Sequence, residues 1–126
     1  MKEIISTTAA PAALGPYSQG VKTEGLLFTS GQLGLDPATG KLVEGGLTAQ
    51  VTQAIDNVEA ILAADGLTLA DVVKSTVFLV SMDDFAAMNE IYASRFPSPF
   101  PARSAVEVGP LAMGALVEIE VVAARH

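Results

Sequence analysis

Two charged side chains near the end of the chain are the clearest candidates for chemistry. Arg103 heads a short alternating segment after Pro101, which has no N–H to give and therefore suits a strand start. Glu118 lies in a second alternating segment, 116–123, with Glu120 on the same face. An arginine in a mostly apolar strand is costly to bury without an anionic partner. We therefore predict that Arg103 and Glu118 pair, either as a structural ion pair or as the centre of a site.

Composition narrows the chemistry open to such a pair. The chain has 126 residues, half of them apolar, and we expect a single domain over 1–126 with its own core. Cysteine is absent, so a thiolate nucleophile and a thiolate metal site are excluded. The one histidine, His126, is the last residue, where chains usually fray. We therefore expect neither histidine-based catalysis nor a histidine-rich metal site.

Charge and hydropathy indicate the partners. The formal net charge is −7 with seven basic residues and no basic run, which argues against nucleic acid. The first residues do not form a signal peptide, and no apolar run approaches the length of a membrane span. We expect a soluble, cytoplasmic protein with no nucleic-acid or membrane partner.

Hydrophobic periodicity predicts the elements that must hold these residues. Two amphipathic helices are too few to cover a sheet of this size on both sides, so we expect a two-layer α+β domain with both helices on one face. The strands are apolar on both faces, so a homo-oligomer is expected to cover the other face. The predicted strands are 2–6, 21–23, 26–30, 72–80, 102–108 and 116–123, and the predicted helices are 48–64 and 81–96.

Local signals set the ends of these elements. Glu24 and Gly25 separate two strand-like runs and indicate a hairpin. Thr48 is expected to cap the first helix and Gly66 to stop it. Ser81 and the two acidic residues that follow Met82 are expected to begin the second helix.

Three further positions are open to a functional interpretation. Tyr17 lies in a loop rich in turn residues, where it either covers the rim of the core or contacts a ligand. Gly31 follows a strand, where glycine permits either the close approach of a ligand or a bulge. Asn89 lies off the apolar face of the second helix, exposed or directed at a neighbour.

Several segments in one order resemble the reactive intermediate deaminase family, also called RidA, YjgF or L-PSP. The similarity runs nearly from end to end, and its segments gain weight from their order and spacing rather than singly. They are Ala10–Gly20, Thr29–Gln32, Ala54–Val58, Val73–Leu79, Phe100–Ser104 with Val106–Val108, and Val117–Glu120.

The resemblance implies a chorismate-mutase-like α+β fold and a homotrimer with sites in the clefts between subunits. It implies hydrolysis of 2-aminoacrylate-derived 2-imino acids to 2-oxo acids and ammonia, with no cofactor and no metal. Carried over by position, Arg103 matches the carboxylate-binding arginine, and Glu118 matches the acid near the attacking water. The positions that match residues lining the cleft are Tyr17, Ser30, Gly31 and Asn89.

The residues suit that chemistry. A guanidinium binds a carboxylate through two parallel hydrogen bonds, so Arg103 is expected to orient the substrate. Glu118 is expected to hold the water, accept its proton and return a proton to the leaving nitrogen. A backbone N–H near Gly31 could assist at the substrate carboxylate. Glu120, on the same face, is a rival for the role of Glu118.

One position departs from the family, and other functions compete. Many members have cysteine where this chain has Ala105, so thiol chemistry is excluded there and the pocket is expected to be larger and more apolar. The main alternative is a non-catalytic trimer that binds small carboxylates such as 2-oxo acids and has a regulatory role. RNA cleavage is a weaker alternative because of the net negative charge, and nothing in the sequence specifically favours a chaperone.

Overall fold

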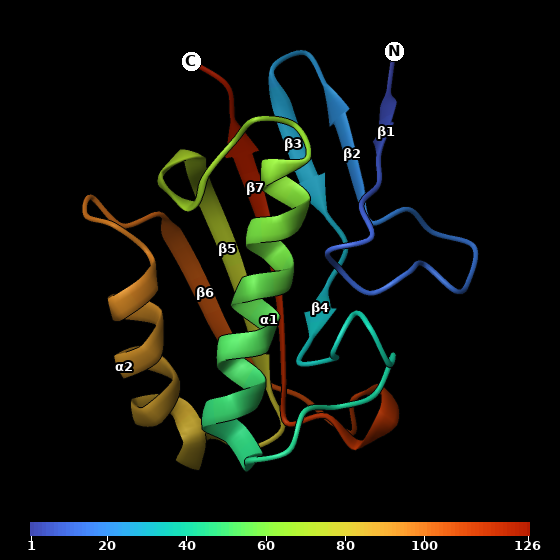
Figure 1. The fold of residues 1–126 in the computed structure, drawn as a ribbon. Helices are drawn as coiled ribbons and strands as arrows, with labels where there is room; N and C mark the ends of the chain where they lie inside the picture. Colours follow the sequence, from blue (N-terminus) through green and yellow to red (C-terminus); the bar gives the residue numbers. More distant parts are fainter.

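The structure, a computed structural model, describes all 126 residues and has two layers (Figure 1). One layer is a sheet, and the other consists of two helices on the same side of it. The helices are α1 (Gly46–Ala63) and α2 (Phe85–Arg95). The strands are β1 (Glu3–Ile5), β2 (Gly20–Thr23), β3 (Leu26–Thr29), β4 (Gln32–Leu33), β5 (Val72–Leu79), β6 (Ala102–Glu107) and β7 (Val117–Ala124). This arrangement confirms the predicted α+β class with both helices on one face.

The sheet is mixed, and β7 lies near its middle. The strand order is β1-β2-β3-β7-β5-β6, and the short β4 also pairs with β7. Only β5 and β6 run parallel, because the crossover between them contains α2. The two candidate residues Arg103 and Glu118 therefore lie on strands that are separated by β5.

The hairpin between β2 and β3 has the predicted turn. Glu24 and Gly25 have φ values of 48° and 83°, the left-handed backbone that a two-residue hairpin of this twist requires. Glycine adopts this conformation without steric cost, and the register from Gly20↔Thr29 to Thr23↔Leu26 fixes which side chains face the helices.

The core lies between α1 and the sheet. The apolar stripe of α1 is fully buried at Val51, Ile55 and Val58, and it packs against the inward side chains of β7, including Val117 and Ile119. Burial of an aliphatic side chain contributes about 1.5–3 kcal/mol relative to exposure, so this contact makes a large contribution to the stability of the fold. Neither helix has the length and hydrophobicity that a membrane span requires.

Two helix starts differ from the prediction. Gly45, not Thr48, precedes the first turn of α1, and no side chain caps that end. Gly45 has a φ of 113°, which residues with a Cβ rarely adopt, so backbone conformation rather than a hydroxyl cap sets this end. Ser81 does act as a cap, but its Oγ accepts from Asp83 N in a 3₁₀ turn, and α2 begins only at Phe85.

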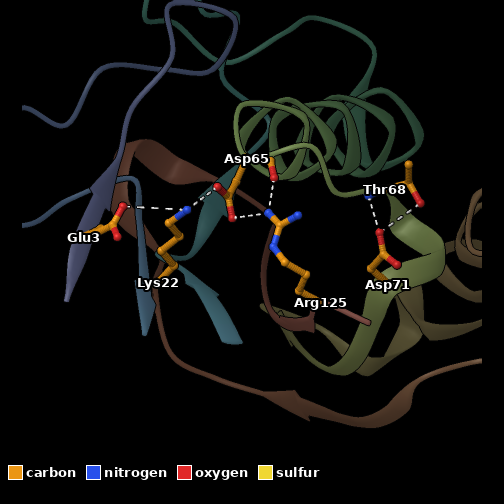
Figure 2. A network of polar contacts seen from close by, with 6 residues as sticks. All are labelled: Glu3, Lys22, Asp65, Thr68, Asp71 and Arg125. Atoms are coloured by element: carbon orange, nitrogen blue, oxygen red, sulfur yellow. Dashed lines mark hydrogen bonds and ion pairs between the residues drawn. The ribbon is translucent and has the colours of Figure 1, made fainter. Parts of the chain in front are cut away.

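A network of charged side chains joins the two ends of the chain (Figure 2). Asp65, just after α1, accepts a hydrogen bond from Lys22 Nζ at 2.8 Å and another from Arg125 Nη2 at 2.9 Å. Lys22 Nζ also lies 3.7 Å from Oε2 of Glu3 on β1. Lys22 and Arg125 together hold the pKa of Asp65 below its ordinary range, so the carboxylate stays charged and paired near neutral pH.

The face of the sheet opposite the helices is not covered. Outward side chains of β3 and β6 include Leu26, Phe28 and Val106, which are 37%, 42% and 41% exposed. Polar side chains of β7, Glu118 and Glu120, share this face with them. We call this surface the open face.

Candidate functional site

Arg103 lies on the helix side of the sheet. Its register partner on β5 is Ser75, which is fully buried beneath α2. The guanidinium carbon lies 4.8 Å from the centroid of the Tyr92 ring and 5.5 Å from that of Phe85. Both distances are within the range of an attractive cation–π interaction. Two rings of one helix therefore hold the charge that the sequence led us to expect beside a carboxylate.

The guanidinium has no anionic partner in the chain. No ion pair includes Arg103, and its side chain donates no hydrogen bond to another residue. Contact with ring faces leaves the five in-plane N–H groups unused. Arg103 borders a cavity of about 430 Å³, which is also lined by Asn89, Tyr92, Ala93, Phe100 and Pro101.

Glu118 lies on the other side of the sheet, so the predicted pairing with Arg103 is wrong within one chain. Its register partner on β5 is Phe78, and its neighbours Val117 and Ile119 are the residues that face the core. Strand β6 turns Arg103 toward the helices and leaves Val106 on the open face. An edge strand does not have to direct its larger apolar residues inward, so alternation alone does not decide which face of β6 meets the helices.

The environment of Glu118 favours its neutral form. Partial burial raises the pKa of its carboxyl above the ordinary value, and the negative charge of Glu120 on the same face raises it further. A carboxyl with a raised pKa both accepts and returns protons closer to neutral pH, which suits a general acid–base.

Gly31 brings the backbone directly against Glu118. A Cβ on Gly31 would lie 1.9 Å from Glu118 Oε2, so only glycine leaves room for the carboxylate in this position. The pairing of β3 and β4 with β7 shifts by one residue between Phe28↔Val122 and Gln32↔Ile119. This shift is a bulge at Ser30 and Gly31, a feature that often re-aims groups beside functional sites. Gly31 therefore lies in a bulge and also permits the close approach of another group, the two roles that the sequence left open.

Ser30 and Tyr17 are linked through the loop before β2. Ser30 Oγ donates to Ser18 O at 2.5 Å, and Ser30 N donates to Gln19 O at 2.9 Å. Gln19 is buried and anchors the loop through bonds to the backbone of Thr7, Ala10 and Pro11. Tyr17 is 54% exposed and lines a shallow cavity of about 660 Å³ between this loop and β1. Its ring thus stays at the surface rather than in the core.

Asn89 lies on the same side of the sheet as Arg103. It lines the same cavity, and its Oδ1 is buried without a hydrogen-bond partner. Ala105 does not line this cavity but packs against the core, so its expected effect on the pocket stays a prediction. The predicted site residues therefore form two groups, Arg103 with Asn89 on the helix side and Glu118, Gly31 and Ser30 on the open side.

Tyr92 and Phe100 were not predicted as site residues. Tyr92 recurs at helical spacing after Phe85 and Met88, which indicated only a core stripe. Tyr92 becomes a candidate only when this stripe is known to pack against the strand that carries Arg103. The sequence does not reveal which helix covers which strand. No three His, Cys, Asp or Glu side chains cluster in a way that could hold a metal ion.

Comparison with known proteins agrees with this architecture. The family model described as Endoribonuclease L-PSP matches residues 7–125. A 2-iminobutanoate/2-iminopropanoate deaminase of Capra hircus is 48% identical over 125 residues, 99% of this chain and 91% of the relative. A RutC family protein of Pyrococcus horikoshii is 50% identical over the full length of both chains. The crystal structure of RidA from an Antarctic Psychrobacter superposes with a TM-score of 0.94 at 46% identity, covering 97% of this chain and 98% of that one.

A family match over nearly the whole chain, full-length relatives near 50% identity and a shared fold lead to one assignment. The chain belongs to the RidA/YjgF/L-PSP family, which confirms the resemblance seen in its sequence.

Proposed function

We propose that this protein is a 2-iminobutanoate/2-iminopropanoate deaminase. The observation that carries the proposal is the Arg103 guanidinium, which is held by ring faces with its in-plane donors free beside a small cavity. Relatives that cover almost the whole chain bear this name in Capra hircus, Bos taurus and Homo sapiens, at 46–48% identity. A 2-imino acid has the carboxylate that such an arginine selects.

The complete site is formed by two copies of the chain. Arg103 and Glu118 lie on opposite faces of one sheet, so a single small substrate cannot contact both in the same chain. The open face, with its exposed Phe28 and Val106, is suited to packing against another copy. We assign a homotrimer in which Arg103 and Asn89 of one copy meet Glu118, Gly31, Ser30 and Tyr17 of the next.

The reaction needs only orientation and proton transfer. Arg103 binds the substrate carboxylate through two hydrogen bonds, and Asn89 lines the cavity beside it. Glu118 accepts a proton from water as the oxygen adds to the imine carbon. It then returns that proton to the nitrogen, which gives a carbinolamine. Glu118 next carries the proton of the carbinolamine hydroxyl to the amino nitrogen, and the C–N bond breaks as the C=O bond forms, giving a 2-oxo acid and ammonia. General acid–base catalysis of this kind contributes roughly 10²–10⁴-fold.

Ribonuclease activity has less support, although the matching family model has that description. The formal charge of −7 opposes binding to a polyanion. The cytoplasmic location expected from the sequence stays a prediction, which cell fractionation would test.

Imine decay is the direct test of the activity. A serine or threonine dehydratase would generate the imino acid in situ, and release of 2-oxo acid and ammonia would be followed with wild-type protein and with Arg103→Ala. We expect acceleration by the wild type and a loss of at least about 100-fold in kcat/KM for the variant, because the bound carboxylate loses its partner. If the folded wild type binds 2-oxo acids but does not accelerate decay, the non-catalytic carboxylate-binding alternative is correct.

Complementation tests the shared site. Arg103→Ala and Glu118→Gln chains would be co-refolded in equal amounts and compared with each variant refolded alone. Mixed oligomers contain some sites with both wild-type side chains, so activity should reappear in the mixture only. Light scattering would give the assembly state, and an active monomer at micromolar concentration would rule out the shared site.

A further inference from the structure

The charge of Arg103 is held by aromatic side chains alone. An arginine that binds a ligand carboxylate has to be fixed in orientation without a resident carboxylate, because a resident anion would compete with the substrate for the same donors. Ring faces meet both needs, since they attract the cation from above and leave its edge free. Tyr92 is the nearer of the two rings, at 4.8 Å against 5.5 Å for Phe85.

Tyr92 is itself fixed from two directions. Its hydroxyl lies 2.6 Å from Ser75 Oγ in a buried hydrogen bond, and its ring stacks on Phe96 at 4.1 Å with an interplanar angle of 17°. Tyr92 is only 4% exposed, and Ser75 is fully buried. Ser75 is also the register partner of Arg103 across β5 and β6. The strand beside the arginine thus fixes the ring on which the guanidinium rests.

We propose that Tyr92, locked by Ser75, is a positioning residue that sets the plane of the Arg103 guanidinium so that its paired donors face the cavity. This inference rests on the proposed function, in which Arg103 binds the substrate carboxylate. It explains why a tyrosine hydroxyl is buried in the helix–sheet interface, where phenylalanine would fill the same space. A ring free to rotate or shift would let the guanidinium tilt, and a bidentate contact tolerates little tilt.

Three substitutions separate the contribution of the Tyr92 ring from that of its hydrogen bond to Ser75. Tyr92→Leu removes the aromatic face and should raise KM by about 5- to 30-fold, the equivalent of a partly or fully desolvated cation–π contact. Tyr92→Phe and Ser75→Ala keep the ring and remove only the hydrogen bond, so each should raise KM by at most about 10-fold. All three should leave kcat nearly unchanged, because Glu118 and its water lie on the other half of the site.

Phe96→Leu is the matched control. It removes a ring that is as buried as Tyr92 and belongs to the same stack, but Phe96 does not contact the guanidinium. We expect thermal stability to fall for both Phe96→Leu and Tyr92→Leu, and KM to rise much less for Phe96→Leu than for Tyr92→Leu, because the Ser75 hydrogen bond still fixes the Tyr92 ring beside the guanidinium. An equal rise in KM for both variants, or an unchanged KM for Tyr92→Leu, would overturn the proposal and leave Tyr92 as a core residue.

The binding of 2-oxobutanoate, measured by calorimetry, tests the role of Tyr92 independently of imine hydrolysis. Affinity should fall in the order wild type, Tyr92→Phe, Tyr92→Leu, Arg103→Ala, whether or not imines are hydrolysed. If wild type binds 2-oxobutanoate but does not turn imines over, the proposed function fails and the order still decides the role of Tyr92. If wild type shows neither binding nor turnover, both proposals are wrong.

Discussion

Charged side chains gather in two regions of this fold and are treated differently in each. In the network around Asp65, every member has an opposite charge within 4 Å, and the network joins β1, β2, the end of α1 and the end of the chain (Figure 2). At the candidate site, Arg103 rests on rings, and Glu118 lies beside glycine and a like charge. Paired charges hold strands together, whereas charges kept from pairing retain their binding capacity for a ligand.

The pKa values of Asp65 and Glu118 are shifted in opposite directions in these two regions. Hydrogen bonds from Lys22 and Arg125 lower the pKa of Asp65 and stabilise its charged form. Burial and Glu120 raise the pKa of Glu118 and destabilise its charged form. The first carboxylate therefore stabilises the fold near neutral pH, and the second is costly to ionise there. Four predictions test this contrast.

The largest effect is expected at Glu118. Glu118→Gln removes the group that exchanges protons with water and should lower kcat by about 100-fold or more, while stability at pH 7 stays equal or rises because a costly charge is gone. Steady-state imine hydrolysis and urea unfolding measure the two quantities. Glu120→Gln is the control, and if it abolishes activity while Glu118→Gln does not, the roles are reversed.

We also expect Glu120→Gln to shift the pH dependence of the activity. The carboxylate form of Glu118 accepts the proton from water, so activity should rise with pH through its raised pKa. Removing the neighbouring negative charge lowers that pKa, so the acidic limb of the kcat/KM profile should move to lower pH. An acidic limb that moves upward or stays in place would contradict the assignment.

An intermediate effect is expected at Gly31. Gly31→Ala places a methyl group where Glu118 Oε2 now lies, so the carboxylate has to swing away. We expect a loss of about 10- to 100-fold in kcat/KM, the size typical of a displaced catalytic group, with little loss of stability because the end of a flexible side chain moves. Gly109→Ala is the matched control, since a Cβ there meets no atom within 4 Å. Equal activity of the two variants would show that the position of Glu118 is unimportant.

The smallest effect is expected at Asp65 and concerns stability alone. Asp65→Asn should lower the free energy of unfolding by about 1 kcal/mol and leave activity unchanged, because the network is near the surface and includes none of the candidate site residues. Its folded-state pKa is depressed, so its contribution is present above the ordinary aspartate value of about 4 and is lost as pH falls through the lower folded value. Urea unfolding at pH 7 and pH 3 should show the difference from wild type shrinking at pH 3.

Asp56→Asn is the control for the network, since Asp56 pairs only with Arg95 and its side chain is 48% exposed. Asp56→Asn should lower the free energy of unfolding by less than Asp65→Asn does. A larger loss at Asp56, or a loss of activity at Asp65, would mean that the two regions are not separate in function.

Much of the fold could be predicted because its signals are local. The glycine of the hairpin turn, the apolar stripe of α1 and the alternation of β7 each act within a few residues, and each element lies where it was expected. The start of α2 was misjudged because serine and two acidic residues fit a 3₁₀ turn as well as an α-helix. The short β4 was missed because a bulge, not a change of pattern, separates it from β3.

The candidate residues were identified, but their arrangement was not. The sequence by itself determined the family, the residue types available for chemistry and the inward face of β7, since adjacent residues and alternation are sufficient for these. Only the tertiary structure decided that Arg103 faces the helices, that Tyr92 lies beneath it and that Glu118 is on the opposite side. The physical reason is that β6 is an edge strand, whose orientation depends on what α2 places against it rather than on which of its own residues are most apolar.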